Sequence, residues 1–209
     1  MCIPPNGGKV TGLRDPVAMV DTKMTKTVGE HWVCATLARH GWAPALTRDG
    51  IERTDILAVG TRLPRRPTLE IQVKASSDRG TRTSWPLGGV VQAFAASEHE
   101  WFVLVLLPKV PDAPKAFVIP RDHVCAGAWI AHEDWRTDPS APEGKRNAGV
   151  SRARTPLKVW QRYEDRWDLL GTPTSQVPVL LPDLLRERAQ NSRVGLPPGH
   201  PWQKALPEW

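Results

Sequence analysis

Residues 30–74 decide the fold of this chain. They begin with EHWVCATLARHGW (30–42), whose apolar spacing predicts a helix that stops at its glycine. RTDILAV (53–59) follows and predicts a strand. LEIQVKASS (69–77) predicts a further strand, which ends in a polar run. The sequence therefore predicts a helix followed by paired strands.

The last of these strands carries polar side chains at alternate positions. Because side chains alternate between the two faces of a strand, Glu70, Gln72 and Lys74 share one face. Asp55 stands at the start of the preceding strand, where hairpin pairing would bring its carboxylate next to Gln72. Glu30 lies on the helix before both strands and is expected to face the same point. The alternatives are a turn role for Asp55 and a helix-dipole role for Glu30.

Further elements are predicted along the chain. The nearly unbroken apolar run WFVLVLLPK (101–109) is typical of a strand covered on both faces. The other expected elements are helices at 28–40, 90–97, 121–136 and 182–191 and strands at 42–50 and 116–120. We expect an N-terminal arm over 1–24, one domain over 25–170, and an extension over 171–209 with a short helix and a proline-rich tail.

This order of elements and residues resembles the PD-(D/E)XK nuclease superfamily over roughly residues 25–120. The shared features are a glutamate on the first helix, an aspartate on a strand, Gln-x-Lys on the next strand, and then another helix and strand. The resemblance implies an α/β fold with a restriction-endonuclease-like core, a central mixed sheet flanked by helices in α-β-β-β-α-β order. The chain departs from the family at Gln72, where most members have an acid and some carry glutamine.

The resemblance implies a catalytic site made of Glu30, Asp55, Gln72 and Lys74. The implied metal ligands are Asp55, Gln72 and Glu30, with Glu70 as a substitute on the same strand face. Mg²⁺, or Mn²⁺, is the implied cofactor, because oxygen ligands without sulfur suit a hard cation. The implied function is a metal-dependent nuclease that hydrolyses phosphodiester bonds, with DNA as the expected substrate.

Two other interpretations stay open at this point. An amide is a neutral and weaker ligand than a carboxylate, so Gln72 is also compatible with a catalytically impaired module of the same fold. Such a module would bind nucleic acid or a partner protein. In the third interpretation, Asp55, Gln72 and Lys74 form a structural hydrogen-bonded cluster.

The polar segment after the Gln-x-Lys strand is the expected place for substrate contacts. In nucleases of this class the corresponding region often approaches the substrate, so nucleic-acid contacts are expected from Ser76, Arg79 and Arg82. A flexible linker is the alternative. Gln92, on the helix expected at 90–97, is a further expected contact. The basic segment 137–154 likewise predicts either a surface loop or a nucleic-acid contact.

The overall composition favours a polyanionic partner. The 209 residues include 28 Lys and Arg against 22 Asp and Glu, which gives a net charge of +6. Three cysteines without a CxxC spacing predict reduced thiols and a cytoplasmic protein. No apolar run reaches the roughly 18 residues of a membrane span, and the N-terminus lacks the pattern of a secretory signal. A homodimer is also considered, because many nucleases that cut both strands work as pairs.

Overall fold

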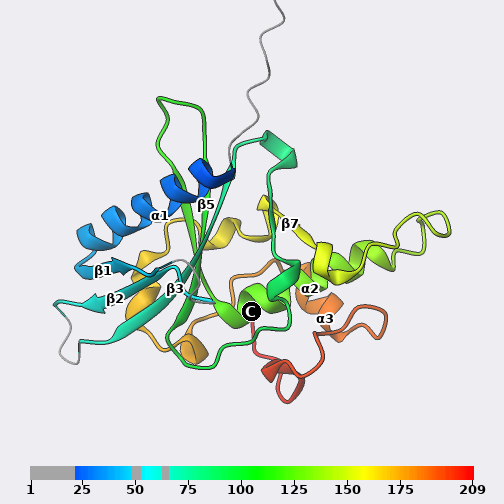
Figure 1. Ribbon diagram of the computed structural model, residues 1–209. Coiled ribbons are helices and arrows are strands. Elements are labelled where there is room, and N and C mark those ends of the chain that lie inside the picture. The colour runs from blue at the N-terminus through cyan, green and yellow to red at the C-terminus, as the bar shows by residue number, and fades with distance from the viewer. Residues whose placement is uncertain (1–21, 49–52, 63–65) are drawn as a thin grey trace, which may run out of the picture.

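The computed structural model describes residues 22–48, 53–62 and 66–209. In these residues a five-stranded mixed sheet with the order β1-β2-β3-β5-β6 forms the centre (Figure 1). Its strands are β1 (Trp42–Leu46), β2 (Ile56–Gly60), β3 (Thr68–Ser77), β5 (Glu100–Leu107) and β6 (Lys115–Pro120). Only β3 and β5 run parallel, and the other neighbours are antiparallel. The expected α/β architecture with a mixed sheet is confirmed.

Three α-helices flank this sheet in the described part of the chain. They are α1 (Thr22–Arg39), α2 (Arg121–Arg136) and α3 (Asp183–Gln190). The arm expected over 1–24 lies outside the described residues up to position 21, and residues 22–24 belong to α1. None of the helices in residues 22–48, 53–62 and 66–209 has the length and apolar character that a membrane crossing needs.

β5 is buried on both faces, as its apolar run predicts. Trp101, Val103 and Val105 pack on the side of the sheet that α1 covers. Phe102, Leu104 and Leu106 pack on the opposite side. On the neighbouring strand β3, Glu70, Gln72 and Lys74 are only partly buried, so this face of β3 is less completely covered than β5.

α1 contacts β3 through a single stripe of residues. Gly29, Val33 and Leu37 are its buried positions and are spaced four residues apart. A Cβ atom at Gly29 would lie 2.7 Å from the Cβ of Ala75 on β3. Because only glycine allows this approach, the helix rests directly on the strand that carries Gln72 and Lys74.

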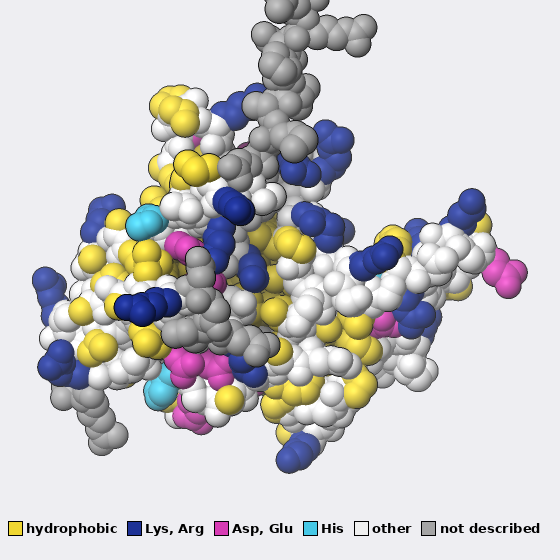
Figure 2. All heavy atoms as spheres, viewed as in Figure 1, with side chains coloured by type: hydrophobic (Ala, Val, Ile, Leu, Met, Phe, Trp, Pro, Cys, Tyr) yellow, Lys and Arg dark blue, Asp and Glu magenta, His cyan; other side chains and the backbone are white. Residues whose placement is uncertain are grey.

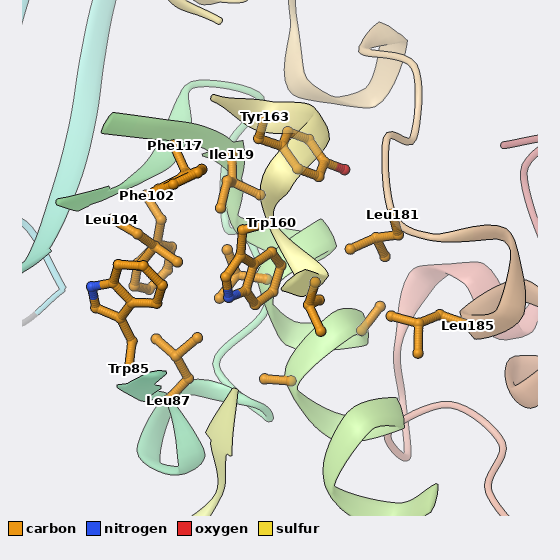
Figure 3. Close-up of a cluster of buried hydrophobic side chains, with 14 of the residues drawn as sticks. Trp85, Leu87, Phe102, Leu104, Phe117, Ile119, Trp160, Tyr163, Leu181 and Leu185 are labelled. Carbon is orange, nitrogen blue, oxygen red and sulfur yellow. The ribbon is translucent and has the colours of Figure 1, made fainter. Parts of the chain in front are cut away.

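The core on the other side of the sheet is built from distant parts of the chain. Figure 3 shows Phe102, Leu104, Phe117 and Ile119 from the sheet facing Trp85, Trp160 and Leu181. Trp85 lies on β4 (Ser84–Pro86), which pairs with β7 (Arg154–Pro156) in a separate two-stranded sheet. Residues 171–209 contribute Val179, Leu181, Leu185 and Val194 to the same core.

The prediction of an α-helix over residues 90–97 is wrong. A 3-10 turn at Gly88–Val90 is followed by turns and a bend, so the parallel strands β3 and β5 are joined without an α-helix. Side chains from elsewhere take up the backbone groups of this segment. Glu100 accepts from the N–H groups of Ala96 and Ser97 at 2.6 and 3.1 Å. Arg53 donates to the Phe94 carbonyl at 2.6 Å, which replaces a helical hydrogen bond.

Candidate active site

The pairing of β2 with β3 brings Asp55 next to Gln72. Ile56 is the Cα partner of Ile71, and one further step along the antiparallel register places Asp55 opposite Gln72. The Asp55 N–H donates to the Ile71 carbonyl at 2.9 Å, and Asp55 Oδ2 accepts from the Val73 N–H at 2.8 Å. Within the described residues no hydrogen bond reaches Oδ1 of Asp55.

Lys74 lies two residues beyond Gln72 and projects from the same face of β3. The Cα partners of Gln72 and Lys74 on β5 are Phe102 and Leu104. Lys74 is half-buried, and no carboxylate of the described residues forms an ion pair with it. The strand therefore presents an amide and an ammonium group side by side, next to the carboxylate of Asp55.

Gln72 has a partner that the sequence patterns do not indicate. Its Oε1 accepts from Arg121 Nη2 at 3.2 Å. Arg121 is the first residue of α2 and is 1% exposed. Its guanidinium lies 4.8 Å from the ring centroid of Phe102, the β5 neighbour of Gln72. A buried cation thus fixes the orientation of the amide and occupies one of its oxygen lone pairs.

The charge of Arg121 is balanced by Glu100 at the start of β5. Arg121 Nε lies 2.7 Å from Glu100 Oε2, and Arg53 Nη2 contacts the same oxygen at 2.9 Å. Burial lowers the pKa of Arg121, and the charge of Glu100 opposes this shift. Burial also disfavours ionisation of Glu100, but hydrogen bonds from Ala96 and Arg53 and the charge of Arg121 outweigh it, so the Glu100 pKa is lowered.

Glu70 lies on the same face of β3 as Gln72 and has a polar partner of its own. Its Oε2 accepts from the Thr54 hydroxyl at 3.3 Å, and its Cα partner on β5 is Glu100. It lies on the strand face of Gln72, two residues earlier along β3. Glu70 therefore lies close to Thr54, which directly precedes Asp55, and its role as a substitute ligand stays a prediction.

Glu30 approaches β3 from the other side of the sheet. It follows Gly29, whose position is in contact with Ala75, on the face that α1 covers. Its side chain is 15% exposed, and its Oε1 lies 3.5 Å from Lys26 Nζ. Burial, and secondly the charge of Glu30, raise the pKa of the Cys34 thiol one turn further along α1. The structure thus groups Asp55, Gln72, Glu70 and Lys74, and it places Glu30 on the opposite face of β3.

The segment after β3 is an ordered turn that presents arginines. Asp78 Oδ1 accepts from the Gly80 N–H at 2.7 Å and from the Thr83 hydroxyl at 3.2 Å. Arg79 and Arg82 are exposed on this turn. Figure 2 shows dark-blue Lys and Arg side chains gathered along the upper part of this face. Hydrogen bonds to Asp78 therefore stabilise the turn, and the side chains of Arg79 and Arg82 are exposed to solvent.

Ser76 and Gln92, the other two expected contact residues, have different surroundings. The Ser76 hydroxyl is within hydrogen-bond distance of the Ser84 carbonyl at 3.3 Å, which links the end of β3 to β4. Gln92 is exposed in the turns that replace the expected helix. Ser76 therefore lies on the path from Lys74 to β4, whereas Gln92 is presented by a loop.

Sequence reasoning missed Arg53, Glu100 and Arg121. The signal in the sequence is weak: Glu100 directly precedes an apolar strand, and Arg121 directly follows another. Charged residues at such borders are usually solvated, and only the packing of α2 against the sheet buries these. The described residues contain no group of three or more His, Cys, Asp or Glu side chains arranged to hold a metal ion. Comparisons with family models, curated proteins and solved structures found no match to this chain.

Proposed function

We propose that this chain is a metal-dependent nuclease that hydrolyses phosphodiester bonds, with DNA as the expected substrate. The observation that carries the proposal is the grouping of Asp55, directly before β2, with Gln72 and Lys74 on the adjacent strand β3. The order of helix, three antiparallel strands and a fourth parallel strand also supports the resemblance to the PD-(D/E)XK superfamily. The missing second helix is a local departure, explained by the side-chain hydrogen bonds of residues 93–97.

The oxygen donors of the site fit a divalent cation that keeps much of its water shell. Asp55 Oδ1 and the remaining lone pair of Gln72 Oε1 would hold the ion, with Glu70 as a further carboxylate. Mg²⁺ is commonly held by one or two carboxylates together with substrate phosphate oxygens, so a cluster of three acidic ligands is not required. When bound, such an ion polarises the phosphate and lowers the pKa of a coordinated water.

Lys74 supplies a positive charge at the same point. Its ammonium group would contact a non-bridging phosphate oxygen and offset the negative charge that grows as the attacking oxygen approaches phosphorus. No carboxylate among the described residues pairs with Lys74 and neutralises this charge. The half-buried setting lowers the local dielectric and strengthens the interaction.

A nucleic-acid-binding module without cleavage is the second candidate. The observation that favours it is the hydrogen bond that Arg121 donates to Gln72 Oε1. This oxygen is the only atom of the amide that could bind a cation, and the hydrogen bond occupies one of its lone pairs. In that case the same basic surface would bind a polyanion without a metal. The two candidates differ in whether added Mg²⁺ produces broken phosphodiester bonds.

The deciding experiment incubates the purified chain with single-stranded, linear duplex and branched DNA in Mg²⁺ or Mn²⁺. The nuclease proposal expects cleavage that falls about 10²- to 10³-fold in Lys74→Ala and in Asp55→Asn. Lys204→Ala and Asp112→Asn remove an exposed ammonium and an exposed carboxylate elsewhere and serve as matched controls. Absence of cleavage of all substrates, with DNA binding that EDTA does not weaken, would establish the binding module. A gain of activity in Gln72→Glu would show that the amide limits metal binding.

A further inference from the structure

Two neighbouring cavities lie near β4 and α2 and share part of their lining. A cavity of about 650 Å³ lies between the turn at 81–84, α2 and the segment around Lys158. A second cavity of about 250 Å³ adjoins it on the side of Arg152. Ala131, Trp135 and Arg154 line both cavities, so the two spaces lie side by side with these residues between them. We call this surface the Trp135 trough and define it by Arg82, Trp135, Arg152, Arg154, Lys158 and Leu184.

The trough carries positive charge that no carboxylate in the described part of the chain neutralises. Arg82, Arg152 and Lys158 form no ion pair with a described carboxylate, and Arg154 donates only to the uncharged oxygens of Ser84. The two acids of the lining are already paired. Asp134 contacts Arg188 and Arg193 at 3.0 and 2.6 Å, and Asp138 contacts Arg146 at 2.8 Å. The free cations therefore set the sign of the potential in the trough.

An exposed aromatic ring stands among these cations. Trp135 is 43% exposed, although it is the type of side chain that normally buries most of its surface. The Arg146 guanidinium lies 5.7 Å from its ring centroid, and the His132 ring lies 5.6 Å away. These contacts hold the indole in place and leave part of it open to the trough. A fixed aromatic ring beside several cations is the usual platform for an unpaired base.

The trough is connected to the candidate active site through the end of β3. Lys74 and Ser76 project from the same face, about 7 Å apart along the strand. The Ser76 hydroxyl lies 3.3 Å from the Ser84 carbonyl, and Arg154 Nη2 donates to the same carbonyl at 3.0 Å. Two contacts therefore lead from the strand of Lys74 to the trough.

We infer that the Trp135 trough binds a single-stranded segment of nucleic acid, with a base stacked on Trp135 and phosphates on Arg82, Arg152, Arg154 and Lys158. In a duplex the bases are stacked on one another and offer no free face to an indole, so the unpaired form fits better. An acidic polypeptide would match the charge but would leave the aromatic surface unused. The inference rests on the proposed function in that it assigns the substrate of that same site an unpaired segment.

The test is fluorescence anisotropy of a labelled single-stranded oligothymidine of about 15 nucleotides, with the full chain in EDTA so that nothing is cut. Trp135→Ala should weaken binding about 5- to 150-fold, the loss expected for one stacked base. Trp135→Phe should recover most of the affinity because it retains a ring. Arg152→Ala combined with Lys158→Ala should reduce the slope of log affinity against log salt by about 1.4. Arg39→Ala combined with Lys204→Ala removes equal charge from exposed positions outside the trough and should leave affinity near the wild-type value.

Several results would overturn the inference. They are wild-type affinity in Trp135→Ala, equal affinity for a matched duplex, or displacement of the DNA by polyglutamate at equal charge. Circular dichroism of each variant guards against unfolding, and Trp135→Phe supplies a variant that preserves packing. Cleavage assays separate this inference from the nuclease proposal. If the trough variants lose binding while the wild type cuts nothing, the binding role of the trough is supported and the nuclease proposal is refuted. If the wild type cuts and Trp135→Ala binds and cuts normally, the nuclease proposal is supported and the binding role of the trough is refuted.

Discussion

Replacing Glu100 by glutamine tests the buried charge layer beneath the candidate site. Glu100 Oε2 contacts both Arg121 and Arg53, and Oε1 accepts from two backbone N–H groups. Glutamine keeps the size of the side chain but removes the negative charge. It also places an amide nitrogen or an uncharged oxygen against a guanidinium that is 1% exposed. The variant therefore leaves Arg121 as a buried cation with no charged partner.

The expected cost is large because the pair is buried. Removing one member of a buried ion pair typically costs about 3–5 kcal/mol, since the other charge stays desolvated. Total stabilities of about 5–15 kcal/mol make this a large fraction of the free energy of unfolding. Glu164→Gln breaks the exposed Lys115 pair, whose side chains are 55% and 40% exposed. That control should cost less than about 1 kcal/mol.

Urea unfolding followed by circular dichroism measures both variants. The folded-state pKa of Glu100 lies below its ordinary value of 4.5, so its stabilisation is present above that pH and is lost as pH falls through the folded pKa. The gap between wild type and Glu100→Gln should therefore narrow in acid. A cost in Glu100→Gln no greater than that of Glu164→Gln at pH 7 would refute the reasoning. Adding Arg121→Met to Glu100→Gln should recover part of the loss, because it removes the buried cation while the glutamine keeps an oxygen for the N–H groups of Ala96 and Ser97.

Gly29→Ala should lower the free energy of unfolding by about 1–3 kcal/mol, less up to about 1 kcal/mol gained from helix propensity, because its Cβ would lie 2.7 Å from that of Ala75. Gly89→Ala meets nothing within 4 Å and should be nearly neutral, and equal unfolding midpoints for the two would contradict the contact. Burial lowers the pKa of His123 to about 3, below the value of about 6.5 in the unfolded chain. Between these two values the unfolded state binds more protons than the folded state, so the free energy of unfolding decreases as the pH falls below 6.5. His123 alone should lower the free energy of unfolding by about 2 kcal/mol between pH 6.5 and pH 5. Urea unfolding at both pH values should show that His123→Asn lacks this part of the pH dependence.

The local elements follow from local patterns. The alternation in 69–75 fixes which residues of β3 share a face, and the apolar run of β5 predicts its burial on both sides. The helix expected at 121–136 coincides with α2 and that at 182–191 contains α3, which begins directly after Pro182. In each case the period of apolar side chains, or a proline at the border, carries the information within one segment.

The segment 90–97 shows where such reasoning stops. Its apolar spacing suits a helix, yet its backbone groups are hydrogen-bonded to Arg53, Glu100 and Asp122. The choice between these partners and a helix depends on side chains as far away as 41 residues in the sequence. No pattern within the segment contains that information.

The same distinction applies to the candidate site. The types and spacing of Asp55, Gln72 and Lys74 can be read along the chain, because register and alternation place them within one hairpin. The hydrogen bond from Arg121 to Gln72 joins residues 49 positions apart, and it exists only because α2 packs against the sheet. The Trp135 trough likewise combines the turn at 81–84 with α2 and β7. The periodicity of a helix or strand lies within one segment, so the sequence alone reveals it. Buried charge pairs and surface cavities form only when segments distant in the sequence pack together, so only the tertiary structure reveals them.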